Sequence, residues 1–382
     1  MNHSARDAVC HECDITHPER ETCLMRPPMN VLRLLLLPLL IISTGFSLIG
    51  IKAQSTLPLD IDRVSERVLV MAPKTGNSRV VVLNSQNGLV MLDSGFSPNM
   101  ALRLRAEAER VFDRSDWRYV IVTNEEFLSS GGSAAFTDAE IVAHRDVREV
   151  LELFAEELPT ILDSRREEFQ WRVDTARARL DTMAQPPEGL VNWLQLCEAV
   201  AADLSAGFTI PFPTLSFDDR LTLDLGDLTL ECIYFGDAAS WGDVMVRVPE
   251  ENLVWTGDVF HAMHVLPYAD NPDRGFDIDR WISILKELLS GDPATMKAFR
   301  ANGTGEWSWQ TVNDRYRLMV DIRKIAGEAQ ADGSTLEALL ERINDVESCF
   351  PYVANWEGSP PDLIRDDIRR TAEGVWYSIL PM

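Results

Sequence analysis

The sequence predicts an α/β fold in which helices pack on β-sheets, and two observations support this prediction. Short runs of branched and aliphatic residues, typical of strands, occur at 66–72, 78–84, 88–95, 117–123 and 139–144. A helical pattern at 97–112 stands between the third and fourth of these runs. Strand, helix and strand in this order, with little polar sequence between them, indicate an α/β sandwich.

Local signals place the first elements. Asn87 and Gly88 stand between two of the strand-like runs, and because both residue types tolerate positive φ, they predict a tight hairpin. Ser97 is expected to cap the helix that follows, with Pro98 in its first turn. We therefore expect a hairpin and then a helix at the start of the domain.

A helical insertion is expected at about 145–206, where apolar residues recur every three to four positions and Pro186–Pro187 interrupts the pattern. The later part of the chain predicts strands within 220–236, 243–249 and 252–258, then helices at 277–289, 309–329 and 335–345. These patterns predict one domain over about 60–330, with the helical insertion inside it. A C-terminal helical extension at 331–382 completes the expected organisation.

The charge of the chain restricts its partners. The formal net charge is −24 at pH 7, and the isoelectric point is near 4.6. Nucleic acid and anionic membrane surfaces would both be repelled by such a charge. We therefore expect no nucleic-acid partner, and a ligand that is a neutral or cationic small molecule, or a protein.

Residues 29–53 predict export, to the periplasm or out of the cell. One arginine precedes an uncharged apolar run from Leu34 to Ile51, as a secretory signal peptide or a short membrane anchor requires. Both alternatives are open. Residues 1–28 contain a Cys-His-Glu-Cys motif at 10–13, but no second pair at a spacing suited to zinc. We expect this leader to be disordered, or an over-extended start.

Several residues with reactive side chains have simple structural interpretations. His144 ends a predicted strand, so we expect a surface or helix-capping role. Asp93 is expected to fasten the loop after its strand through backbone hydrogen bonds. Ser94, Ser129 and Ser130 lack a surrounding Gly-x-Ser-x-Gly elbow. After export an odd number of cysteines remains, which implies no disulfide framework: Cys197, Cys232 and Cys349.

Four stretches of the sequence carry a resemblance to a known family. They are GLVMLDSG at 88–95, YVIVTNEEFLSSGGSAAF at 119–136, FGDAASWGDVMVRVPEENLVWTGDVF at 235–260 and FRANGTG at 299–305. In order and spacing they resemble the motifs of the metallo-β-lactamase-fold superfamily, over about residues 60–330. The resemblance implies a four-layered αββα sandwich, with the catalytic cleft at one edge of the two sheets.

The family's hydrolytic chemistry needs a set of metal ligands, and the resemblance locates their positions here. Imidazoles and carboxylates hold one or two zinc ions, which activate water and polarise the group under attack. When the loop is aligned on Gly131 and Gly132, six of the seven expected ligands are replaced. The seven positions are Asn124, Glu126, Leu128, Ser129, Ala239, Asp258 and Asn302, and only Asp258 keeps the expected identity.

These replacements predict a degenerate site. Leu128 and Ala239 cannot bind a cation, so we expect no dinuclear zinc centre, no catalytic residue and no cofactor. The leading hypothesis is therefore a non-catalytic protein. It would bind a small molecule or a protein through the former cleft or through the insertion at 145–206.

One alternative is an enzyme with a rearranged mononuclear metal site. Glu126 and Asp258 are carboxylates, and His261 and His264 follow Asp258 closely. Oxygen-rich sets of this kind suit Mg²⁺, Ca²⁺ or Mn²⁺ better than zinc. Such a site would make the chain a hydrolase of the ester, lactam or thioester class. A third hypothesis is a helper protein for a periplasmic oxidoreductase. It rests on likeness of residues 256–267 and of the helical insertion to a branch associated with quinoprotein systems, and a shared fold does not fix function.

Overall fold

The computed structural model describes residues 57–74, 78–260, 264–267, 277–291, 296–299, 309–353 and 360–379. The predicted leader at 1–28 and the apolar segment at 29–53 lie outside these ranges. Within the described ranges, no helix combines the length and the apolar character needed to cross a membrane. Cys197, Cys232 and Cys349 are all free thiols, which confirms that these three cysteines form no disulfide framework.

The first sheet has seven strands in the order β1-β2-β3-β4-β5-β6-β7. The strands β1 to β4 pair antiparallel, whereas β4 to β7 pair parallel. Their bounds are β1 (Leu59–Arg63), β2 (Val68–Pro73), β3 (Val80–Ser85), β4 (Gly88–Leu92), β5 (Trp117–Ile121), β6 (Glu140–His144) and β7 (Leu215–Phe217). The antiparallel pair β3–β4 confirms the hairpin predicted at Asn87 and Gly88.

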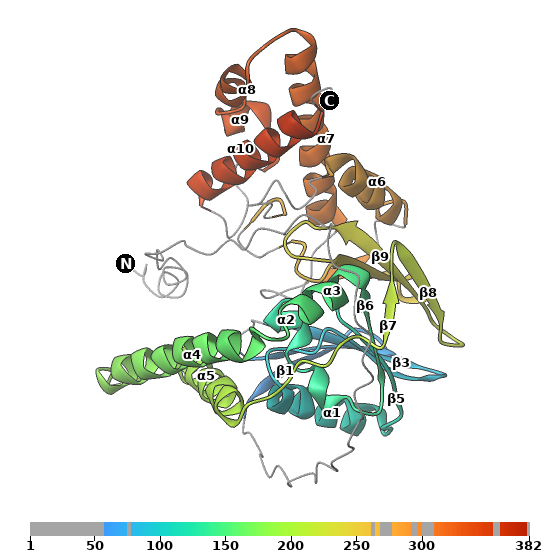
Figure 1. Ribbon diagram of the computed structural model, residues 1–382, viewed down its shortest axis with the longest axis vertical. Coiled ribbons are helices and arrows are strands. Elements are labelled where there is room, and N and C mark those ends of the chain that lie inside the picture. The colour runs from blue at the N-terminus through green and yellow to red at the C-terminus, as the bar shows by residue number, and fades with distance from the viewer. Residues whose placement is uncertain are drawn as a thin grey trace, which may run out of the picture. The chain divides into compact units, whose positions relative to one another are not determined.

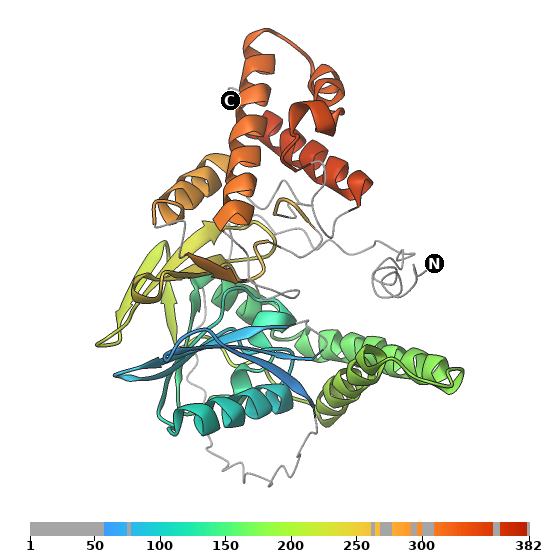
Figure 2. The ribbon, with the colours of Figure 1, turned by 180° about the vertical axis from the view of Figure 1, so that it is seen from behind.

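The second sheet has five strands in the order β12-β11-β10-β9-β8. The strands β8 to β11 pair antiparallel, and β12 joins β11 in parallel. Their bounds are β8 (Arg220–Asp224), β9 (Thr229–Gly236), β10 (Asp243–Val248), β11 (Leu253–Trp255) and β12 (Lys297–Phe299). Figure 1 shows this sheet in yellow and orange, and in Figure 2 the blue strands of the first sheet are seen from behind.

Ten α-helices accompany the sheets within the described ranges. They are α1 (Pro98–Phe112), α2 (Phe127–Ser130), α3 (Arg145–Leu153), α4 (Leu158–Asp181), α5 (Glu188–Ala206), α6 (Ile278–Leu288), α7 (Trp309–Ala331), α8 (Leu336–Arg342), α9 (Val346–Cys349) and α10 (Pro361–Ser378). The helix predicted at 97–112 is confirmed, with Pro98 as its first residue. The predicted cap is not formed, because the Ser97 hydroxyl makes no capping hydrogen bond.

The alternation of side chains along the strands shows how the layers stack. Val68 and Val70 of β2 join one apolar cluster, whereas Leu69 and Met71 join another. The same alternation of residues repeats along β3 and β4, because successive side chains of a strand point to opposite faces of the sheet. The first of these clusters also contains Trp255 and other residues of the second sheet. It is therefore the interior between the two sheets.

The outer faces of both sheets are covered by helices. On the first sheet, residues of α1, α4 and α5 pack against the outward side chains of β2 to β6. On the second sheet, residues of α6, α7 and α10 pack against the outward side chains of β9 to β11. Helices, sheet, sheet and helices in this order are the predicted four-layered αββα sandwich, which the structure confirms.

Three helices lie between β6 and β7. Helix α4 packs along α5 (Figure 1), and the break between them includes Pro186 and Pro187. Two contacts hold these helices to the sandwich. The Phe169 ring meets Phe96 edge to face at a centroid distance of 6.0 Å, and the Asp203 carboxylate accepts a hydrogen bond of 3.0 Å from the Asn99 amide.

Helix α10 contributes to the core, and truncation of one of its buried side chains should lower the free energy of unfolding. Ile368 is 0% exposed, so Ile368→Ala leaves a cavity and should lower the free energy of unfolding by about 2–5 kcal/mol. Ile161 of α4 is 39% exposed, and Ile161→Ala should cost less than about 1 kcal/mol. Urea denaturation measures both. Equal losses would contradict the assignment of α10 to the core.

Candidate functional site

The parallel strands of the first sheet end at one edge, and polar residues follow each of them. Asp93 follows β4, Thr123 and Asn124 follow β5, and His144 ends β6. The carboxyl ends of parallel strands meet at the same sheet edge, which is where open α/β sheets place their ligands. In the second sheet, the loop after β9 and Asp258 after β11 carry the other motif residues.

Asp93 is a buried carboxylate that connects both sheets. It accepts hydrogen bonds of 2.9 Å and 2.8 Å from the amide and the hydroxyl of Thr123. Its other oxygen accepts a hydrogen bond of 2.8 Å from the Trp255 indole of β11. The carboxylate therefore joins the end of β5 to β11. The prediction that it would fasten the loop after its own strand, β4, is wrong. Burial raises the pKa of Asp93 to about 6, although these hydrogen bonds oppose the shift.

The loop after β5 turns through hydrogen bonds of its own. The Asn124 amide oxygen accepts a hydrogen bond of 3.0 Å from the Glu126 backbone amide. The Glu126 carbonyl then accepts hydrogen bonds of 2.9 Å from the amides of both Ser129 and Ser130, which forms the single turn of α2. Two former ligand positions, Asn124 and Glu126, thus shape the turn.

Gly131 and Gly132 allow this loop to pack against the segment after β4. A Cβ atom on Gly132 would lie 2.1 Å from the Ser94 carbonyl oxygen, and one on Gly131 would lie 2.4 Å from the Phe96 carbonyl oxygen. No real side chain fits at such distances from backbone atoms. The close approach brings the Ser94 hydroxyl to the Ser129 carbonyl at 2.8 Å. The two glycines therefore serve the fold irrespective of any metal.

The loop between β9 and β10 is built around the carboxylate of Asp243. One oxygen of Asp243 accepts hydrogen bonds from three successive backbone amides, those of Ala238 (3.0 Å), Ala239 (2.7 Å) and Ser240 (2.8 Å). The other oxygen accepts from the Ser240 hydroxyl at 2.9 Å and lies 3.4 Å from the Asn124 amide nitrogen. Burial raises the pKa of Asp243 to about 6, against these donors. The carboxylate is wholly enclosed by the protein.

Glu125 connects the same two loops. Its carboxylate accepts a hydrogen bond of 2.8 Å from the Trp241 backbone amide. Loss of water around the half-buried side chain raises the pKa of Glu125 well above its ordinary value, and the carboxylates of Glu126 and Asp243 raise it further.

The residues at the former ligand positions do not fit a dinuclear zinc centre. Leu128 and Ala239 are half-buried and carry no donor atom, while Ser129 is buried with its hydroxyl 3.5 Å from that of Thr123. Asp258 is 8% exposed, and Asn302 lies outside the described residues. Zinc requires imidazole, thiolate or carboxylate ligands. Among the described positions only Glu126 and Asp258 offer one.

The described part of the alternative metal site does not assemble. Among the described residues no three His, Cys, Asp or Glu side chains are grouped so that they could hold a metal ion. Glu126, Asp258 and His264 are therefore not gathered at one point. The His264 Nδ1 atom instead lies 2.8 Å from the carboxylate of Asp367 in α10. His261 lies outside the described residues, so a role for it stays a prediction.

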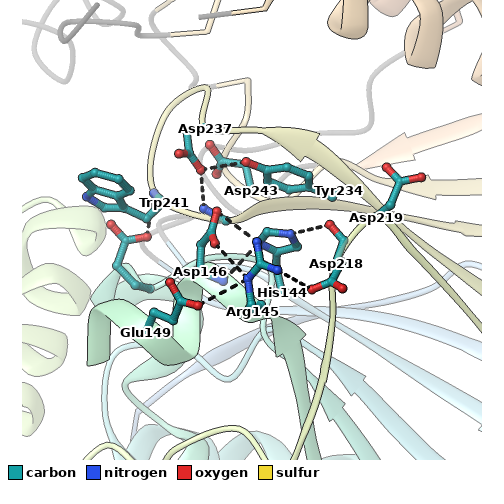
Figure 3. Close-up of polar contacts among 12 residues, drawn as sticks. His144, Arg145, Asp146, Glu149, Asp218, Asp219, Tyr234, Asp237, Trp241 and Asp243 are labelled. Atoms are coloured by element: carbon teal, nitrogen blue, oxygen red, sulfur yellow. Dashed lines mark hydrogen bonds and ion pairs between the residues drawn. The ribbon is translucent and has the colours of Figure 1, made fainter. Parts of the chain in front are cut away.

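His144 has a larger structural role than the sequence indicated. It is 1% exposed, so the predicted surface position is wrong. The capping role is confirmed, because its Nδ1 atom accepts a hydrogen bond of 3.2 Å from the Asp146 amide at the start of α3. The Nε2 atom therefore carries the proton and donates to the Asp218 carbonyl at 2.7 Å. Its ring stacks on Tyr234 of the second sheet at a centroid distance of 3.7 Å (Figure 3).

Two aspartates that sequence reasoning missed frame the loop after β9. Figure 3 shows Asp237 and Asp243 beside this loop, with the Tyr234 hydroxyl next to Asp237. Asp237 accepts hydrogen bonds from the Tyr234 hydroxyl at 3.1 Å and from the Gly242 amide at 2.9 Å. The available signal was the sequence GDAASWGD at 236–243, in which two aspartates flank a short stretch that is small apart from Trp241. Small residues leave the backbone amides accessible to such side chains.

Comparisons with known proteins identify the fold. No protein-family model and no curated protein matches the chain. The stereoselective inverting sec-alkylsulfatase Pisa1 from Pseudomonas sp. is 13% identical with a TM-score of 0.52, and a double mutant of PisA1 is 12% identical with a TM-score of 0.53. Both alignments cover 84% of this chain and 50% of the alkylsulfatase. A metallo-beta-lactamase from Pontibacter korlensis is 13% identical, with a TM-score of 0.42, over 69% of this chain and 99% of that one.

The likeness to the alkylsulfatases, together with the four layers, establishes that the chain has the metallo-β-lactamase fold. Identities of 12% and 13% show the fold alone. The chain spans half the length of these alkylsulfatases.

The tight packing at Gly132 can be tested against a glycine in open space. Gly132→Ala places a methyl group against the Ser94 carbonyl, and it should lower the free energy of unfolding by about 3 kcal/mol. Gly189 of α5 has nothing within 4 Å of its added Cβ, so Gly189→Ala should raise stability by about 0.5–1 kcal/mol. Urea denaturation measures both. A neutral Gly132→Ala would show that the loop does not need the close approach.

The buried carboxylate of Asp93 makes stability depend on pH. Its pKa rises on folding from 3.8 to about 6. A raised carboxyl pKa contributes stability that is fully present below the unfolded value and is lost as pH rises through the folded value. At about 1.4 kcal/mol per pKa unit, wild type should lose roughly 3 kcal/mol relative to Asp93→Asn as pH rises from about 4 to about 7.

Urea denaturation of wild type and Asp93→Asn across this pH range measures the difference. Asparagine suits the position because Asp93 has a φ of 58°, which asparagine tolerates. Asp113→Asn is the control for asparagine at a positive φ, since Asp113 has a φ of 52° on an exposed turn. Parallel pH profiles for wild type and Asp93→Asn would contradict the assignment.

Proposed function

We propose that this chain is an exported protein of the metallo-β-lactamase fold that does not hydrolyse, and that binds a small molecule or a protein instead. The observation that carries the proposal is the enclosure of Asp243 by the amides of 238–240 and by Asn124. In this loop the resemblance places a metal-binding histidine at Ala239. The polar groups of Asn124, Asp243 and the 238–240 backbone are thus hydrogen-bonded to one another.

Most of the side chains that would hold a zinc ion for hydrolysis are also replaced. Water becomes a nucleophile at neutral pH in this fold through imidazole and carboxylate ligands that hold zinc. Leu128, Ser129 and Ala239 cannot replace these ligands. Two of the carboxylates nearby, Asp93 and Asp243, are buried and hydrogen-bonded to the backbone and to side chains, so these two are not available to a substrate.

A binding role would use the accessible side chains of the loops after β5 and β9. Glu126 is exposed, and Leu128, Ala239 and Trp241, which belong to the loops after β5 and β9, are half-buried. An apolar and acidic surface of this kind, on a chain with a net charge of −24, favours a neutral or cationic small molecule or a protein. Export is supported by the apolar segment at 29–53, which also leaves a membrane anchor as an alternative to a cleaved signal.

Metal analysis of the purified protein tests the proposal. Wild type incubated with Zn²⁺ and then desalted should retain substoichiometric zinc, because Asp258 is the only ligand of expected identity among the described positions. Hydrolysis of a chromogenic ester and of a chromogenic lactam should equal the rate without protein. The control variant Asp258→Ala should give the same zinc content and the same rates.

The contrary result has a distinct signature. Stoichiometric zinc, or another divalent metal, together with hydrolysis that a chelator abolishes would overturn the proposal. If Asp258→Ala then lost both metal and turnover, the rearranged mononuclear hydrolase would be the correct function.

A further inference from the structure

The described residues that follow Asp258 are buried in one apolar cluster with the C-terminal helices. Phe260, Val265 and Leu266 are each 0% exposed. They belong to the same apolar cluster as Ile364 and Ile368 of α10 and Leu318 of α7. The residues just beyond the end of β11 are thus packed against a helix of the C-terminal extension, outside the range where the sequence resembles the family.

Asp367 of α10 makes two polar contacts with this segment. One carboxylate oxygen lies 2.8 Å from the His264 Nδ1 atom, and the other accepts a hydrogen bond of 2.9 Å from the Val265 amide. Asp367 is 4% exposed. Hydrogen bonds to a charged group are stronger than those between neutral groups, and leaving one partner buried and unpaired is costly.

Helix α7 supports the same segment from a second direction. The guanidinium group of Arg315 donates a hydrogen bond of 3.1 Å to the His264 carbonyl, and its carbon lies 5.2 Å from the centre of the Phe260 ring. Arg315 is 0% exposed. The backbone at His264 and Val265 is therefore held by one acidic and one basic side chain from two helices.

We propose that α10 acts as a strap that fixes the turn carrying Asp258, with Asp367 as the positioning residue. Within the turn, the Val259 amide donates a long hydrogen bond of 3.3 Å to the Thr256 carbonyl. Asp367 holds the chain a few residues further on, so it limits how far the turn can open. The strap acts on the residues after β11, whereas the Asp93 network joins the end of β5 to β11 and the Asp243 network orders the loop after β9.

Hydrogen exchange of single backbone amides in the full chain tests the strap. In Asp367→Ala, the Val265 amide loses its acceptor and should exchange about 10-fold faster or more. The strap further requires the exchange rate of the Val259 amide to rise by a comparable factor. The acceptor of this amide is the Thr256 carbonyl rather than Asp367. The amide of Val82 in β3 should keep its rate.

Two further variants keep the test decisive. Asp366→Ala removes an exposed aspartate from the same helix, and it should leave the Val259 and Val265 rates unchanged. Asp367→Asn keeps an oxygen for the Val265 amide, so it folds with less disturbance and should give a smaller acceleration at both amides. Acceleration at Val265 alone would overturn the strap, and so would equal acceleration at Val259, Val265 and Val82, which would mean loss of the whole fold.

Discussion

One buried carboxylate, Asp93, occupies the point where the two sheets meet at the site edge. A charge in the protein interior is tolerated only when several donors surround it, and removal of one donor leaves the charge uncompensated. The donors come from Thr123 and from Trp255, which lie on different sheets. The positions of β4, β5 and β11 at this edge therefore depend on one another, and the loops that follow them start from fixed points.

The other loops at this edge are organised by the same principle. Asp243 gathers the amides of 238–240, and Asp237 binds the Gly242 amide from the other end of the loop. The side chain of Asp243 is thus the centre on which the backbone amides of this loop converge. The loop is ordered without an ion, because its amide dipoles converge on an internal negative charge.

Much of the fold was predictable because its signals are local. The Asn-Gly hairpin, the strand-like runs at 66–72, 78–84 and 88–95 and the helices at 145–206 each depend on residues close together in the sequence. The roles of Asp243, His144 and Asp367 were not predictable, since their partners are set by tertiary packing. His144 illustrates this limit: its cap on Asp146 is local and was foreseen, whereas its stacking on Tyr234 and its burial come from the second sheet.

The residue types at the positions where the resemblance places metal ligands can be read from the sequence alone. Aligning Gly131 and Gly132 with the family's motif places Leu128 and Ala239 directly, and no knowledge of side-chain conformation is needed to see that neither binds a metal. The hydrogen-bond partners of Asp243 could not be predicted in the same way. An aspartate in a loop has many potential donors, and the sequence does not rank them.

The placement of α3, α4 and α5 between two neighbouring strands has a consequence for the order of folding. The Ile141 amide of β6 pairs with Thr214, 73 residues further along the chain. Closing so long a loop is entropically costly, whereas α4 and α5 form a contiguous antiparallel pair. We expect this helical pair to form first and to shorten the effective loop, so that β7 is added to the sheet in a late kinetic step.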